Sequence, residues 1–220
     1  MSGLELVAVN TKAGYGSSTT KAKQNGTEQD LWQDGTALSG DLELGLTIKK
    51  ENGNSRSGIG LDLATAQVTT IIGRANDHYL RSALNLGPAY HGDITNPHGR
   101  IAWQAGITGR LETTDIKVND AAVSGHNFSL ALPLAFGLGT SHIFVQDKVR
   151  LMTNFSELKV LNEVSGNWRP YANFNNNFVQ TVEVVLSHTF ASGKINGNTT
   201  ERSEFLFAGL NFGFGYSVKR

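Results

Sequence analysis

The chain has 220 residues, a length at which a β-barrel or a β-sandwich commonly forms one domain. Only 17% of the residues are charged, compared with about 25% in an ordinary soluble domain, and the 19 basic residues equal the 19 acidic ones. The balanced charge argues against nucleic acid as a partner, and the absence of cysteine excludes disulfides and thiolate metal sites. We therefore expect a single domain over residues 1–220.

A transmembrane helix is also excluded, because the sequence contains no run of 18 apolar residues. The first residues, Met1 to Glu5, lack the basic and apolar regions of a secretory signal peptide. This leaves two alternatives, a protein that is not exported and a mature chain with a replacement start.

Along the chain, apolar residues alternate with polar or small residues at a period of two, which is typical of β-strands. Four of the expected strands alternate strongly, namely 38–49, 100–111, 127–139 and 204–218. In chain order, the expected strands cover residues 4–15, 38–49, 57–65, 80–91, 100–111, 127–139, 143–155, 168–178, 179–190 and 204–218.

Polar segments lie between several of these strands. The stretch 16–35 is rich in Ser, Thr, Lys, Gln and Asp, and it is expected to be a polar loop or mobile arm. Segments 112–126 and 191–203 are expected to be further polar loops.

The apolar rows are longer than those of ordinary soluble strands. They run for five to seven alternate positions, which suits a tilted strand crossing hydrocarbon better than the usual soluble strand of about five or six residues. The opposite faces carry mainly Gly, Ala, Ser and Asn, as expected where the walls of a narrow lumen meet. The sequence therefore predicts an all-β fold, a single antiparallel up-and-down transmembrane β-barrel of eight to ten strands. The alternative is a soluble β-sandwich or barrel with the apolar rows inside.

The last strand, Phe205 to Val218, alternates Leu, Phe and Tyr with Gly, Asn and Ser, and it resembles the closing strand of small Gram-negative outer-membrane β-barrels. Upstream, Trp168-Arg169-Pro170-Tyr171-Ala172 is similar to strand openings in that class, which includes autotransporter translocator domains. The resemblance implies a location in the outer membrane, with membrane lipid as a partner.

Charged residues on the polar faces are expected to point into the lumen, where they must pair or be hydrated because an isolated desolvated charge costs several kcal/mol. Two interpretations stay open, an ion-pair plug and a solute path lined by charges. The expected lumen-lining residues are Asp41, Glu43, Lys49, Asp62, Arg100, Arg110 and Glu112. The expected lipid-facing residues are Leu42, Leu44, Leu46, Trp103, Leu130, Leu132, Leu134, Phe212, Phe214 and Tyr216.

The histidines do not form a catalytic pattern. His188 lies in an apolar row and Ser192 is four residues on, whereas a resemblance to outer-membrane lipid deacylases would require a spacing of two. The sequence from His91 to Asp93 is expected to be a solvated loop, and His91 and His98 flank a turn without a third metal ligand fixed by spacing. We expect no catalytic residue, no metal, no cofactor and no enzymatic activity.

Three functions follow as hypotheses. The first is a porin-like pore or channel for ions and small solutes, with a charged narrow lumen. The second is a structural or adhesive outer-membrane barrel that binds a partner through its loops. The third is a soluble all-β binding or coat module. The sequence leaves open whether the protein is an oligomer.

Overall fold

The computed structural model describes residues 2–24, 27–52, 55–72, 77–118, 121–155, 157–173, 178–196 and 199–219. The strands are β1 Ser2–Gln24, β2 Thr27–Asn52, β3 Ser55–Ile72, β4 His78–Asn96, β5 Gly99–Gly106, β6 Thr108–Val118, β7 Ala121–Gly139, β8 Ile143–Thr153, β9 Leu158–Asn173, β10 Phe178–Asn196 and β11 Thr199–Lys219. Within these ranges, no helix is long and apolar enough to cross a membrane.

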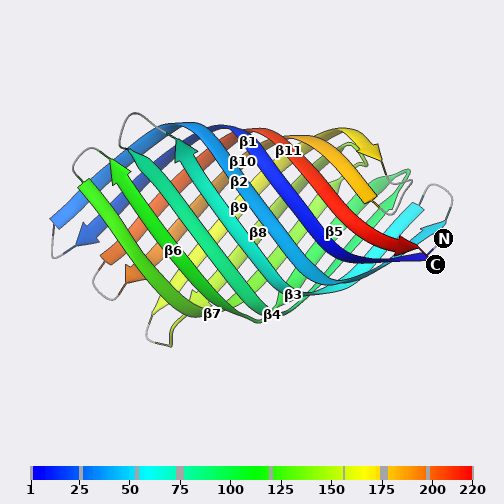
Figure 1. Cartoon of the computed structure of the whole chain (residues 1–220), viewed down its shortest axis with the longest axis horizontal. Coiled ribbons are helices and arrows are strands. Elements are labelled where there is room, and N and C mark those ends of the chain that lie inside the picture. The colour runs from blue at the N-terminus through cyan, green and yellow to red at the C-terminus, as the bar shows by residue number, and fades with distance from the viewer. Residues whose placement is uncertain are drawn as a thin grey trace.

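The strands form one antiparallel sheet that closes on itself (Figure 1). β1 pairs with β11 along its length, from Gly3 opposite Lys219 to Gln24 opposite Thr199. β5 and β6 share one position in the sheet, because both pair with β4 on one side and with β7 on the other. The result is a closed barrel with ten strand positions, which confirms the expected fold class. Closure satisfies the backbone polar groups of every strand without leaving a sheet edge, as a membrane-spanning sheet requires.

The break between β5 and β6 has a local cause on β4. Pro88 has no backbone N–H to donate, and Gly87 before it has a φ of 133°. The ladder is rejoined by a hydrogen bond of 3.0 Å from the Ile107 amide to the Pro88 carbonyl. One strand position therefore contains two assigned strands.

Near the chain termini the outer face of the barrel is apolar and the inner face is polar. On β2, the side chains of Leu42, Leu44 and Leu46 are 39–47% exposed, while Asp41 and Glu43, which alternate with them, point inward. A soluble barrel has the opposite arrangement. The alternative of a soluble module with its apolar rows inside is therefore wrong.

At the end of the barrel away from the termini, this arrangement is reversed. The outer face there carries charged pairs, such as Lys21 with Asp30 at 3.9 Å and His78 with Asp115 at 3.2 Å. The inner face carries a cluster of apolar side chains that we call the apolar plug, consisting of Leu31, Ile71, Tyr79, Ile116, Val123, Phe205 and Phe207. This end resembles a soluble β-barrel in having an apolar core and charged pairs on its exterior.

The register of the strands assembles the apolar plug. Ile71 on β3 lies opposite Tyr79 on β4, Tyr79 lies opposite Ile116 on β6, and Ile116 lies opposite Val123 on β7. From the other side of the barrel, the Phe205 ring on β11 stacks on Tyr79, with ring centroids 5.8 Å apart. The plug therefore extends across the lumen.

The segments expected to be polar loops are instead hairpin arms, which corrects that expectation. The described parts of 16–35 belong to β1 and β2, those of 112–126 to β6 and β7, and those of 191–203 to β10 and β11. Their alternation escapes notice because small polar residues such as Ser18 and Thr20 occupy inward positions.

Several strand boundaries also differ from expectation. Most strands are longer than expected, but the one expected at 143–155 ends at Thr153. The strand expected at 168–178 is the end of β9 followed by the start of β10, with residues 174–177 outside the described ranges. The expected turn after His91 is shorter, because β4 continues to Asn96.

The sidedness can be tested with arginine at two positions on the outer face of β2. Leu44→Arg should lower the unfolding free energy by about 2–4 kcal/mol, because it places a cation in the middle of the apolar belt. The matched substitution Thr36→Arg, eight residues along the same face, should cost no more than about 1 kcal/mol because Thr36 lies at the edge of the belt, next to the exposed Tyr15–Asp34 hydrogen bond. Urea unfolding in lipid vesicles, followed by tryptophan fluorescence, would measure both; equal costs would contradict the assigned belt.

Candidate functional site: the charged lumen

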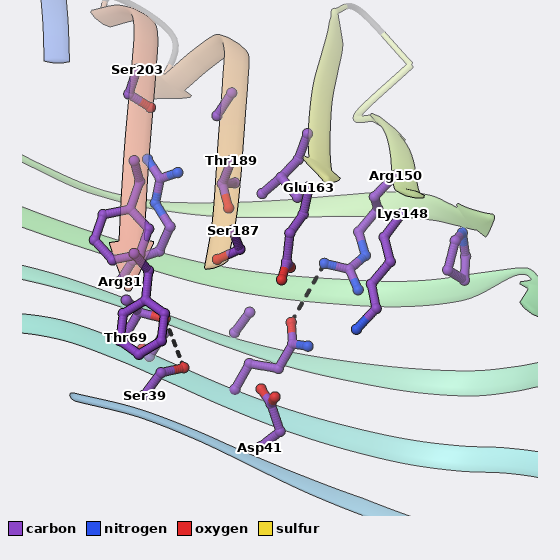
Figure 2. Close-up of a pocket in the computed structure, with 18 of the residues that line it drawn as sticks. Ser39, Asp41, Thr69, Arg81, Lys148, Arg150, Glu163, Ser187, Thr189 and Ser203 are labelled. Carbon is purple, nitrogen blue, oxygen red and sulfur yellow. Dashed lines mark hydrogen bonds between the residues drawn. The ribbon is translucent and has the colours of Figure 1, made fainter. Parts of the chain in front are cut away.

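The lumen contains a cavity of about 120 Å³ between the apolar plug and the end with the termini (Figure 2). Charged side chains from strands on opposite walls line it, among them Lys12, Asp41, Arg110, Arg150 and Glu163. A smaller cavity of about 20 Å³ adjoins Asp62 and shares Arg150 with the first. Charges of both signs therefore meet inside the barrel.

The most buried charges are three residues around Glu112, whose side chain is 4% exposed. Its Oε1 accepts a hydrogen bond of 2.5 Å from Lys159 Nζ, and its Oε2 accepts hydrogen bonds of 2.7 and 3.0 Å from Arg110. Arg110 also donates to Asn85 Oδ1 at 3.0 Å. Because β7 and β8 separate β6 from β9, the Glu112–Lys159 pair crosses the lumen.

Two further contacts cross the lumen beside the cavity. Lys12 on β1 forms an ion pair of 3.5 Å with Glu163 on β9. Arg150 on β8 donates to Gln67 on β3 at 3.4 Å. These contacts span the barrel between strands that do not pair with each other, so they occupy the path along its axis.

Closer to the termini, a histidine connects three strands. His91 Nδ1 lies 3.0 Å from Asp62 Oδ2, and His91 Nε2 lies 2.9 Å from Thr47 Oγ1. Gln104 donates to the same Asp62 oxygen at 3.2 Å. Gly60 makes room for this arrangement, because a Cβ there would lie 2.4 Å from His91 Nε2. His91 is therefore an inward strand residue, and the expectation of a solvated loop from His91 to Asp93 is wrong.

The lumen end near the termini carries two more ion pairs. Arg100 pairs with Asp93 at 2.5 Å, and its guanidinium lies 4.1 Å from the centre of the Phe144 ring. Arg169 pairs with Glu183 at 2.5 Å. These pairs make the mouth of the lumen polar and largely charge-balanced.

The structure brings several of the expected lumen residues together. Asp41 and Arg110 line the larger cavity, Asp62 lines the smaller one, and Glu112 joins Arg110. Glu43 and Lys49 lie on the same inward face of β2, and Arg100 lies at the mouth.

The expected outward residues lie on the outer face. Nine of the ten have exposed side chains, and Phe212 is partly buried between Leu210 and Phe214 on the same face. On β5, Trp103 packs flat over Gly92, where a Cβ would lie 2.4 Å from its indole nitrogen.

Sequence reasoning missed half of the charged lumen. The lumen residues that were not anticipated are Lys12, Arg81, Asp93, Lys148, Arg150, Lys159, Glu163, Arg169 and Glu183. Alternation could have identified some of them, because Lys148 and Arg150 interleave with Val145, Val149 and Leu151. Among the described residues, no group of three His, Asp or Glu side chains could hold a metal ion.

Comparison with known proteins gives only distant structural likenesses. No family model and no curated protein matches the chain. The β domain of the Bordetella autotransporter BrkA is 10% identical, with a TM-score of 0.39 over 94% of this chain and 98% of that one. The translocator domain of the autotransporter NalP from Neisseria meningitidis is 11% identical, with a TM-score of 0.35 over 94% and 88%. Neisserial surface protein A is 14% identical, with a TM-score of 0.33 over 93% and 95%.

The pairing of the strands, rather than these scores, establishes the architecture. A closed antiparallel barrel with an apolar outer belt and a charged lumen is built to span a membrane. The chain is a β-barrel of the outer-membrane type. Its sidedness confirms the resemblance drawn from the closing strand.

The buried network predicts a large cost for removing its carboxylate. Glu112→Gln should lower the unfolding free energy by about 3–5 kcal/mol, because Arg110 and Lys159 lose the carboxylate they share. Glu204→Gln disrupts the exposed pair with His188 and should cost no more than about 1 kcal/mol. Equilibrium unfolding of the refolded barrel would compare them, and similar small costs for both would show that the Glu112 network does not stabilise the fold.

Proposed function

We propose that this protein is an outer-membrane passage for small polar solutes, passive and non-enzymatic, with its charged lumen as the path. The observation that carries the proposal is the charged cavity of about 120 Å³ in the lumen of a closed barrel. Such a space is large enough for several water molecules. Water inside the barrel reduces the desolvation cost of the charges that line it.

The passage is narrow and occluded in this conformation. The Glu112–Lys159 and Lys12–Glu163 pairs join non-neighbouring strands inside the lumen, and the apolar plug fills the lumen at the end away from the termini. Hydrophobic constrictions close pores by excluding water, while charged groups set which solutes enter. We therefore expect infrequent openings of low conductance rather than a permanently open pore.

A second candidate is a plugged barrel with a structural role in the membrane, and the ion pairs that cross the lumen favour it. Barrels of about eight strands leave an interior that side chains fill, and ten strand positions add little to that width. Binding through long loops has less support, because the segments expected to form such loops are hairpin arms.

Conductance after removal of the apolar plug separates the two candidates. Tyr79→Ala combined with Phe205→Ala removes the stacked pair in the lumen and should raise the single-channel conductance in planar bilayers several-fold over the parent protein. The control is Tyr90→Ala combined with Leu206→Ala, on the outer face of the same two strands, where the side chains are 57% and 56% exposed. This control should leave the conductance unchanged.

Absence of conductance would contradict the passage hypothesis. If neither the parent protein nor the Tyr79 and Phe205 variant gives conductance steps, while both migrate as folded barrels on unheated gels, the passage hypothesis fails. The plugged structural barrel would then account for the fold.

A further inference from the structure

The larger lumen cavity has an excess of basic side chains. Lys12, Arg81, Arg110, Lys148 and Arg150 line it, against Asp41 and Glu163. Among the five cations, Lys12 pairs with Glu163 and Arg110 pairs with Glu112. Basic side chains therefore outnumber the acidic ones that line the cavity.

Lys148 and Arg150 are partly exposed and point into the cavity. They lie two residues apart on the inward face of β8, and Figure 2 shows both side chains reaching into the cavity. Among the described residues, neither forms an ion pair within 4 Å with a carboxylate. Arg150 lies opposite Pro133 on β7 and Leu161 on β9, whereas Lys148 lies opposite Glu163, whose carboxylate pairs with Lys12.

The guanidinium of Arg150 also has unused hydrogen-bonding capacity. Its Nε is buried without a hydrogen-bond partner in the described structure, and its contact with Gln67 is long at 3.4 Å. A buried donor without a partner is costly, and a charge-assisted bond to an anion would satisfy it. The protein itself therefore leaves this donor of Arg150 without an acceptor among the described residues.

The remaining wall supplies neutral donors. Ser187 and Thr189 on β10 face the cavity from one side, and Ser39 and Thr69, whose hydroxyl oxygens are 3.2 Å apart, face it from another (Figure 2). Hydroxyl groups and a guanidinium around a compact space match the several acceptor oxygens of a tetrahedral or carboxylate anion. A cation would instead be repelled by Lys148 and Arg150.

We propose that this cavity is a binding site for a small oxyanion of the phosphate or carboxylate class, with Lys148 and Arg150 as its charged ligands. The inference deepens the proposed passage and rests on it for the step of transport, because basic side chains in a lumen select anions. Binding itself needs no open pore. The carboxylate of Asp41 also lines the cavity and repels anions, so the site should accept only anions small enough to stay away from it.

The test is equilibrium titration of the detergent-solubilised full chain with inorganic phosphate, sulfate and acetate at constant ionic strength, with sodium chloride as the reference. The parent protein should bind at least one of the oxyanions saturably. Lys148→Gln and Arg150→Gln should each weaken that binding at least tenfold, and Arg150→Lys should retain part of it. Lys21→Gln, which removes a cation from the polar exterior, should change nothing.

Each outcome decides the proposal. Absence of saturable binding to the parent protein overturns it, as does binding that Lys148→Gln and Arg150→Gln leave intact. If those variants do not refold, a rise in the thermal unfolding midpoint of the parent protein with phosphate but not with chloride supports the site, and equal midpoints overturn it. Conductance without oxyanion binding refutes the site alone, whereas binding without conductance refutes the passage alone.

Discussion

Closure of the sheet in lipid is the constraint on which the rest of this structure depends. Every backbone donor and acceptor of a spanning strand must pair within the sheet, so β1 meets β11 and no edge is left. Because side chains alternate along a strand, an apolar exterior forces the other half of the residues into the lumen. The charged interior is therefore a consequence of the same alternation that makes the belt.

Beyond the apolar belt the outer face no longer has to be apolar, and the two faces of the barrel wall exchange their polarity. The hairpin arms beyond the belt carry Lys21, Asp30 and Asp115 outside and the apolar plug inside. Burial of apolar side chains stabilises that end as it does a soluble protein. The barrel is therefore apolar outside and polar inside near the termini, and charged outside and apolar inside at the other end. This reversal places an apolar constriction next to a charged cavity.

This reversal explains how much the sequence could predict. Alternation in segments such as 127–139 and 204–218 was enough for the closed barrel and for its outward rows, since each row is long and continuous. The arms were missed because residues 16–35 contain a single large inward apolar residue, Leu31, among many small polar ones. Alternation can be recognised only when the two faces of a strand differ clearly in polarity or size. Small polar residues on both faces make that difference too small to see.

The sequence could predict which charged residues face the lumen, but not which of them form pairs with each other. Asp41, Arg110 and Glu112 follow from position on a strand, but the contacts of Glu112 with Lys159 and of Lys12 with Glu163 depend on the closure and tilt of the whole barrel. Both pairs join strands that are not neighbours in the sheet, so no local pattern encodes them. Local alternation determines which side chains face the lumen, whereas the register of the whole barrel determines which of the charged ones form ion pairs.

That distinction bears on function. If every lumen charge had a partner across the barrel, the interior would be a plug, because breaking a buried pair is expensive. The pairs around Glu112 and Glu163 meet this description, while Lys148 and Arg150 beside them do not. The lumen thus contains charges that are fixed by ion pairs and others that the proposal assigns to a ligand. The proposed passage and its anion site therefore both rest on Lys148 and Arg150, the cavity cations that form no ion pair within 4 Å among the described residues.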